Sequence, residues 1–257
     1  GDSTATSATQ LDGDRERIRR AYAARGYLST RVEAFVAPAA GGLGNVAATA
    51  GLVAADRDPG TLTLRFAITE GPITAVDRIE VAASGDGATA GRSCKDALLA
   101  VIAAMNIPEP SVAIAGCSAS LRGVALETSK LEAAGAKARD LFRDRAHADV
   151  AIAYAIEANA DATHAQVRYA LELGPVVRFG ESVIRGNFRT RSSIVRDIAG
   201  DARDQPLTPQ AIDRQLRALR SSGLFDSANY ELLPFRDGDR VNAVLRLRER
   251  HDPRVIV

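Results

Sequence analysis

The chain is poor in several residue types that build metal or cofactor sites. It has no tryptophan, three histidines and two cysteines among 257 residues, and aromatic residues make up only 5%. The histidines at 147, 164 and 251 show no metal-ligand spacing, and two cysteines alone do not make a structural zinc site. The sequence therefore predicts neither a metal site nor a cofactor.

Long apolar runs and an excess of charge are also missing. No apolar run reaches the ~18 residues that a membrane-spanning helix needs, and the formal net charge is +1. A nearly neutral chain lacks the basic surface on which nucleic acids bind, so no nucleic-acid partner is expected. Apolar residues make up 46% and charged residues 25%, which is an ordinary composition for a folded protein of two or three small domains.

The two cysteines leave two interpretations open. A disulfide between Cys94 and Cys117 would close the segment between them and stabilise the fold by roughly 3 kcal/mol in the chain-entropy model. Alternatively, both remain unpaired, half-buried thiols. We expect the disulfide, although spacing alone does not report the distance between the two residues.

One strand pattern occurs three times along the chain. Apolar residues alternate with polar ones in the segments Thr61 to Pro72, His164 to Pro175 and Arg240 to Pro253. A period of two with one apolar face indicates a half-buried strand. A second alternating run precedes each segment, and Gly, Asp and Asn are frequent in the connections. Each unit is therefore predicted to close with a β-hairpin.

A helix is predicted before each hairpin, most clearly before the last one. Thr208 is suited to the N-cap and Pro209 to the first helical position, and Gly223 fits a left-handed stop. A strand and a further helix precede this helix in the middle and last units. The element order is thus β-α-α-β-β twice, whereas the first unit has only ten residues before its helix region and lacks room for the leading pair.

This tandem order resembles POTRA (polypeptide-transport-associated) domains. The segment FGESVIRGNFRTRSSIVRDIAG looks like a POTRA opening, with a strand, a Gly-Asn turn and a helix started by Thr190. The segment LTPQAIDRQLRALRSSGLFDSANYELLP resembles the second half, in which a helix ends in glycine and leads into an edge strand. The resemblance implies an α+β fold of tandem units, each a three-stranded mixed sheet covered by two helices on one face.

The resemblance also suggests a division of the chain. We expect an incomplete first unit at 1–71, a second unit at 72–174 with a long segment between its helices, a third at 175–251, and the start of a link to a missing barrel at 252–257. Such a string of units is similar to the periplasmic arm of BamA/TamA-like outer-membrane protein assembly factors. This implies a location in the periplasm, attached to the outer membrane through a C-terminal β-barrel absent from this chain.

The function implied by the resemblance is binding of unfolded client strands or partner proteins by β-augmentation. An edge strand carries unpaired N–H and C=O groups to which an extended chain can add. We expect the first strand of each hairpin to be this edge. In the last unit the expected contacts are Asn229, Tyr230, Glu231 and Leu232.

Several kinds of partner follow from the same resemblance. They are unfolded outer-membrane or secreted proteins, a periplasmic partner subunit, and the chain's own C-terminal β-barrel in the full-length protein. Two alternatives stay open: the arm of a two-partner secretion transporter, or a purely structural scaffold or interaction domain.

Two other classes fit the residues poorly. An enzyme needs a group of reactive side chains in a pocket, whereas Glu181 is a single carboxylate inside a strand pattern. We therefore predict no enzymatic activity. A KH domain also begins β-α-α-β-β, but it needs a GXXG loop to hold the nucleic-acid backbone. The corresponding segment, IAGDARDQPLTP, has one glycine and acidic residues that repel phosphate.

Overall fold

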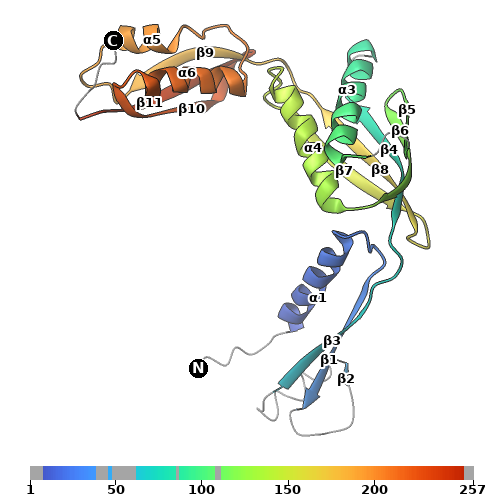
Figure 1. Ribbon diagram of the computed structural model, residues 1–257. Helices are drawn as coiled ribbons and strands as arrows, with labels where there is room; N and C mark the ends of the chain where they lie inside the picture. Colours follow the sequence, from blue (N-terminus) through green and yellow to red (C-terminus); the bar gives the residue numbers. More distant parts are fainter. Residues whose placement is uncertain (1–7, 39–45, 48–61, 85–86, 108–110, 252–257) are drawn as a thin grey trace. The chain divides into compact units, whose positions relative to one another are not determined.

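The computed structural model describes residues 8–38, 46–47, 62–84, 87–107 and 111–251 (Figure 1). Most of the predicted connection in the first hairpin and the predicted link at 252–257 lie outside these residues. The described part contains five helices and three β-sheets, and the sheet nearest the C-terminal end of the sequence combines parallel and antiparallel strands. The predicted α+β fold class is therefore confirmed.

The first sheet follows helix α1 (Ala8–Ala23) and consists of β1 (Arg31–Pro38), β2 (Val46–Ala47) and β3 (Leu62–Thr69). Its strand order is β2-β1-β3, and β1 runs antiparallel to both neighbours. Helix and sheet meet in a small apolar core that contains Leu11, Ala34, Leu64 and Phe66.

The position of β1 corrects one expectation. We predicted that the first strand of each hairpin lies at a sheet edge, but β1 is the central strand of its sheet. Its residues Phe35 and Val36 pair with β2, which comes from the long connection between β1 and β3. The sequence did not show this because the two-residue strand β2 is too short to give a periodic pattern.

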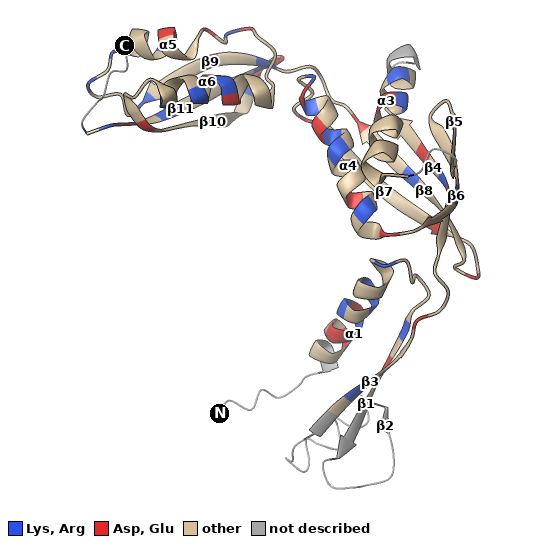
Figure 2. Ribbon diagram, viewed as in Figure 1, with Lys and Arg blue, Asp and Glu red and all other residues tan. Residues whose placement is uncertain are grey.

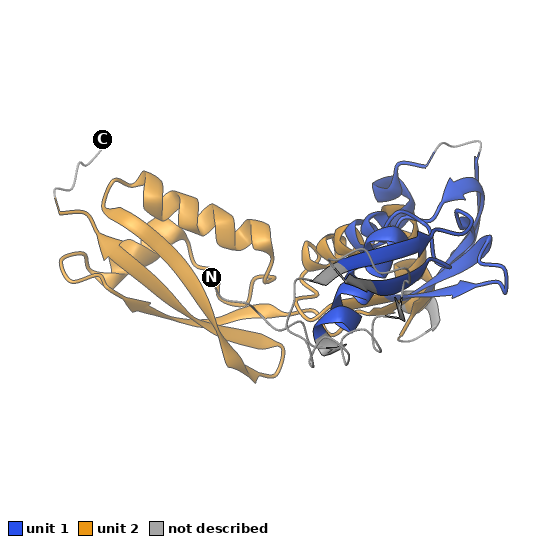
Figure 3. Ribbon diagram, turned by 90° about the horizontal axis from the view of Figure 1, so that it is seen from below, with its two compact units in different colours: residues 1–81, 101–134, 154–169 blue, residues 82–100, 135–153, 170–257 orange. Residues whose placement is uncertain are grey.

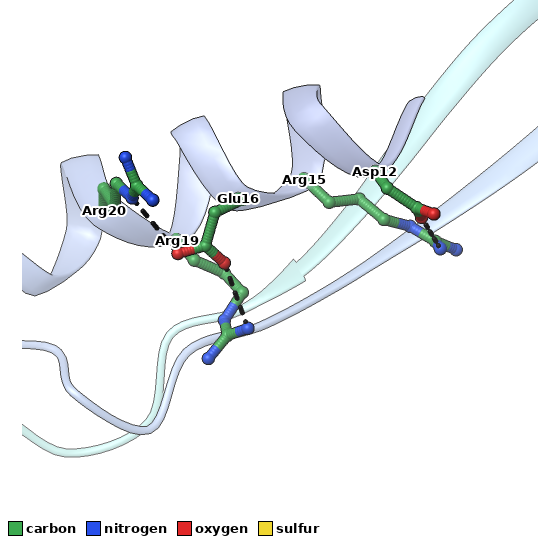
Figure 4. A network of polar contacts seen from close by, with 5 residues as sticks. All are labelled: Asp12, Arg15, Glu16, Arg19 and Arg20. Carbon is green, nitrogen blue, oxygen red and sulfur yellow. Dashed lines mark hydrogen bonds and ion pairs between the residues drawn. The ribbon is translucent and has the colours of Figure 1, made fainter. Parts of the chain in front are cut away.

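Helix α1 carries a row of ion pairs on its outer surface (Figure 4). Arg15 lies 3.1 Å from Asp12, and both Arg19 and Arg20 lie 3.2 Å from Glu16. Pairs at these spacings stabilise a helix by about 0.3–0.5 kcal/mol each when they are exposed. They therefore support a helix of modest apolarity and need no further functional explanation.

The second sheet has five strands: β4 (Ala75–Ala83), β5 (Val112–Ala115), β6 (Ser118–Ala125), β7 (Ala151–Ala158) and β8 (His164–Glu172). Their order is β5-β6-β4-β8-β7. A three-stranded sheet was predicted here, so the number of strands was wrong. The long segment between the helices forms the additional hairpin β5-β6, which joins the sheet by antiparallel pairing of β6 with β4.

Two helices accompany this sheet, α3 (Gly87–Met105) and α4 (Thr128–Arg143). Each buries one stripe of its surface, because buried residues recur at intervals of three and four positions. The stripe of α3 contains Cys94, Ala97, Leu98, Val101 and Met105, and that of α4 contains Leu131, Ala134, Ala138 and Phe142. The buried hydroxyl of Tyr169 on β8 donates a hydrogen bond to the Leu131 carbonyl at 2.8 Å.

The third sheet consists of β9 (Arg178–Arg185), β10 (Phe225–Asp237) and β11 (Arg240–Glu249), with helices α5 (Ser192–Ala199) and α6 (Pro209–Ser221). The order is β10-β11-β9, and β11 is antiparallel to β10 and parallel to β9. This part therefore has the predicted β-α-α-β-β order and the predicted three-stranded mixed sheet.

The helix signals of this part are confirmed for α6 and corrected for α5. The Thr208 hydroxyl accepts a hydrogen bond from the Ala211 N–H at 3.1 Å, and Gly223 has a φ of +75°. Helix α5, in contrast, starts one residue later than predicted, with Arg191 at its N-cap and no side-chain cap. Thr190 lies before the N-cap, and its N–H donates a hydrogen bond to Glu249.

By residue contacts the chain divides into two compact units (Figure 3). One consists of residues 1–81, 101–134 and 154–169, and the other of residues 82–100, 135–153 and 170–257. The five-stranded sheet contributes residues to both units. Our division into three consecutive domains stays a prediction. No helix in the described residues is both long and apolar enough to cross a membrane.

Candidate protein-binding edges

Strand β10 is an edge strand of the third sheet, as predicted from the hairpin pattern. It pairs regularly with β11 from Ser227 to Leu232, and the register shifts on both sides of this stretch. The second shift includes Pro234, which has no N–H to donate. The stretch from Ser227 to Leu232 is therefore the part of β10 on which a guest strand could pair most regularly.

The four residues predicted as contacts do not share one environment. Asn229 and Glu231 are exposed, and the Glu231 carboxylate lies 2.6 Å from Arg246 on β11. Leu232 remains 43% exposed. Because successive strand residues point to opposite faces, the backbone edge is the feature common to all four.

Tyr230 is directed toward the helices. Its hydroxyl donates a hydrogen bond to the Gln215 side chain on α6 at 2.8 Å, and its ring lies 6.3 Å from that of Phe179. Burial raises the pKa of this tyrosine above its ordinary value. Its side chain therefore takes part in packing the sheet against the helices, and its backbone is the part that remains for a guest strand.

Strand β7 is a second edge, at one end of the five-stranded order. Natural edge strands are commonly protected by charged residues, proline or bulges. In contrast, β7 reads AIAYAIEA, with Glu157 as its one charged residue and no proline. Its half-buried side chains, Ile152, Tyr154 and Ile156, alternate with exposed ones. As the first strand of its hairpin, β7 was predicted to be an edge, and the sheet order confirms this position, although no contact residues were named on it.

Strand β7 carries little charge, whereas helix α4 carries several charged residues of both signs (Figure 2). One of them reaches β7: the Tyr154 hydroxyl lies 3.4 Å from Glu132 of α4. Burial, and secondly the charge of Glu132, raises the pKa of Tyr154. An extended chain lying along β7 would therefore meet a mostly apolar strand beside a charged helix.

A turn at the end of the third sheet is organised by one carboxylate. Glu249 accepts hydrogen bonds from the Arg189 N–H at 2.9 Å and from the Thr190 N–H at 2.7 Å. The Asn187 side chain donates to the Thr190 carbonyl at 2.9 Å. These bonds fix the predicted Gly-Asn turn that leads from β9 into α5.

We expect Glu249→Gln to weaken the fold in a pH-dependent way. Burial alone would raise the pKa of Glu249, but the bonds from Thr190 and Arg189 outweigh it and lower the pKa. A carboxyl group whose pKa is lower in the folded than in the unfolded state stabilises the fold at pH values above its unfolded pKa. This stabilising contribution is lost as the pH falls through the folded pKa. In urea unfolding, Glu249→Gln should have a clearly lower free energy of unfolding than the unmodified chain at pH 7. This difference should shrink below about pH 4. A loss that stays constant with pH would contradict this role.

Both cysteines are disulfide-bonded, and neither is a free thiol. Because the chain has only two cysteines, we predict that Cys94 is bonded to Cys117. Iodoacetamide should add no mass to the unfolded, unreduced chain and two adducts after reduction. Alkylation without reductant would show that the thiols are free.

The described residues contain no group of three or more side chains that could hold a metal ion. The candidate functional features described above are the sheet edges at β7 and β10.

The sheet order β10-β11-β9 with two helices, preceded by related helix-hairpin units, defines the POTRA fold, and comparison with solved structures agrees. A structure of POTRA domains 3–5 of BamA from Haemophilus influenzae matches with a TM-score of 0.54 and 12% identity, over 95% of this chain and 82% of that chain. The chain thus has the fold of tandem POTRA domains.

Weaker matches include the N-terminal domain of Omp85 from Thermosynechococcus elongatus, with a TM-score of 0.32, 18% identity, and coverage of 96% of this chain and 86% of that chain. POTRA domains 1–2 of Omp85 from Anabaena match with a TM-score of 0.40 and 12% identity, over 71% of this chain and 97% of that chain. No protein-family model and no curated protein matches the sequence.

Proposed function

We propose that this chain is the periplasmic POTRA arm of an outer-membrane β-barrel assembly or translocation factor. In this proposal it binds unfolded client strands or partner proteins by adding them to its edge strands. The likeness in fold to the BamA domains supports the class of protein. The disulfide-bonded cysteines agree with an oxidising compartment such as the periplasm.

The observation that carries the proposal is the presence of the edge strands β7 and β10 in two different sheets. A guest strand gains backbone hydrogen bonds there without needing a particular sequence. Each bond contributes only about 1 kcal/mol net, so a short pairing is weak and reversible. Weak binding at more than one edge suits a protein that holds unfolded chains briefly and passes them on.

Cross-linking tests the proposal at β10. Cysteine is placed at Asn229, which is exposed on the edge strand, and in a control variant at Arg217, which is exposed on α6. A urea-unfolded outer-membrane porin carrying a thiol-reactive cross-linker is then diluted into each protein. We expect at least fivefold more cross-linked product with Asn229→Cys than with Arg217→Cys. Equal yields would count against strand addition and favour a scaffold that does not bind clients.

A further inference from the structure

A cleft of about 750 Å³ opens beside strand β9, the edge strand opposite β10 in the third sheet. Its lining includes apolar and aromatic side chains of the sheet and of α5, namely Ile184, Tyr230, Leu245, Val195 and Ala199. Its rim is charged, and across it Arg203 lies 3.5 Å from Glu181. Because arginine and acidic residues are mixed on this rim, the cleft favours no ligand of one charge sign.

The backbone of β9 is covered at one end and open at the other. The Phe179 N–H donates to the Gln205 carbonyl, and the Asp204 N–H donates to the Phe179 carbonyl, both at 2.9 Å. Past this point, residues 181–185 have no backbone hydrogen bond in the described structure to any segment other than β11. Of this open part, Glu181, Ser182 and Ile184 line the cleft, and the Glu181 N–H donates to the Asn242 side chain of β11 at 2.7 Å.

The hydroxyl of Tyr230, which lines the cleft, already has a hydrogen-bond partner. The Tyr230 hydroxyl donates a hydrogen bond to the Gln215 side chain at 2.8 Å. Gln215, which is only 7% exposed, also donates to the Gly200 carbonyl at 3.4 Å. A ligand entering the cleft therefore meets polar and apolar side chains together, and beside them the edge of β9 that pairs with no other strand.

We propose that this cleft and the edge of β9 together bind an extended polypeptide segment, with one apolar side chain of the segment inserted between α5 and the sheet. The backbone groups of β9 require a partner that supplies N–H and C=O groups at strand spacing, which an extended chain does. Main-chain bonds would then give affinity, and the cleft would select the residue type at one position. The inference rests on the proposed function and adds a third acceptor edge that has a side-chain pocket.

Photo-cross-linking locates the inserted side chain. The probe is a decapeptide of alternating threonine and valine in which one central valine is replaced by photo-leucine. After irradiation, we expect adducts within residues 195–203, which form the end of α5 and the loop after it. A second peptide, N-methylated at alternate residues so that one edge lacks donors, should lose these adducts at least fivefold, because strand pairing needs them.

A matched pair of variants tests the cleft itself. Ala199→Trp places an indole in the cleft, whereas Ser193→Trp places the same group on an exposed position of α5 that does not line the cleft. We expect the adducts at 195–203 to fall at least fivefold in Ala199→Trp and to stay within twofold of the unmodified chain in Ser193→Trp. Circular dichroism checks that both variants fold, and the N-methylated peptide gives an answer on the unmodified chain if Ala199→Trp does not.

The outcomes separate this inference from the proposed function. Adducts confined to β7, β10 and their neighbouring helices would overturn the β9 site and leave the proposed function standing. Adducts at 195–203 that persist in Ala199→Trp, or with the N-methylated peptide, would also overturn it. Absence of adducts at all three edges would contradict both.

Discussion

Replacing Gly186 with alanine is expected to lower the free energy of unfolding by about 3 kcal/mol or more, counting both backbone strain and steric overlap. Gly186 has a φ of +90°, a conformation that residues with a side chain rarely adopt. A Cβ atom at this position would also collide with the Leu247 carbonyl oxygen. The overlap involves backbone of β11, which cannot move aside without disturbing the sheet.

Gly238→Ala is the matched control for this substitution. Gly238 also has a positive φ, +62°, but a Cβ there would meet nothing within 4 Å. We expect a loss of about 1 kcal/mol, from the backbone conformation alone. Urea unfolding followed by circular dichroism compares the two variants. Equal losses would show that the close approach of β9 and β11 at Gly186 does not constrain the fold.

Phe225→Ala is expected to cost about 3–5 kcal/mol of folding free energy, as is usual when a buried phenylalanine is removed. Phe225 is 1% exposed and begins β10. It packs in the cluster that joins α5 and α6 to the sheet, which contains Val195, Leu219, Ala228, Leu245 and Leu247. Removing its ring would leave a cavity at the point where the helix layer meets the edge strand.

Phe235 provides the control on the same strand. It is 82% exposed, so Phe235→Ala should change the free energy of unfolding by no more than about 0.5 kcal/mol. The same urea experiment measures both variants. A loss for Phe235→Ala close to that for Phe225→Ala would mean that the end of β10 is buried in solution, and that this part of the edge is closed to guests.

The third sheet was predictable from the sequence because local and tertiary signals agree there. Thr208, Pro209 and Gly223 mark the two ends of α6, and the alternation in β11 gives a strand with one buried face. The resemblance to POTRA domains then supplied the strand order, which periodicity alone does not determine. Element boundaries were less certain, as the start of α5 after Thr190 shows.

The second sheet shows where the pattern was insufficient. Strand β5 has only four residues, VAIA, and a short apolar run does not distinguish a strand from a buried loop or helix segment. The signal that was overlooked is the two-residue connection Gly116-Cys117, in which Gly116 has a φ of +62°. A glycine with positive φ between two alternating runs is typical of a tight hairpin.

The candidate site was predicted in part. Alternation identified β10 as a strand, and the resemblance placed it at an edge, which the sheet order confirms. The Tyr230 side chain points toward α6, where it is hydrogen-bonded to Gln215. The edge of β1 is covered because β1 pairs with β2. Both are long-range contacts, so a single sequence without its tertiary partners does not reveal them.

Amide hydrogen exchange in the chain saturated with an unfolded outer-membrane protein tests strand addition most directly. In an edge strand, alternate N–H groups point away from the sheet, so a guest strand should slow exchange at every second residue of β7 and of Ser227–Leu232 in β10. We predict this alternating protection together with unchanged exchange on the exposed face of α6. Protection confined to helix surfaces, with exchange at both edges unchanged, would contradict it.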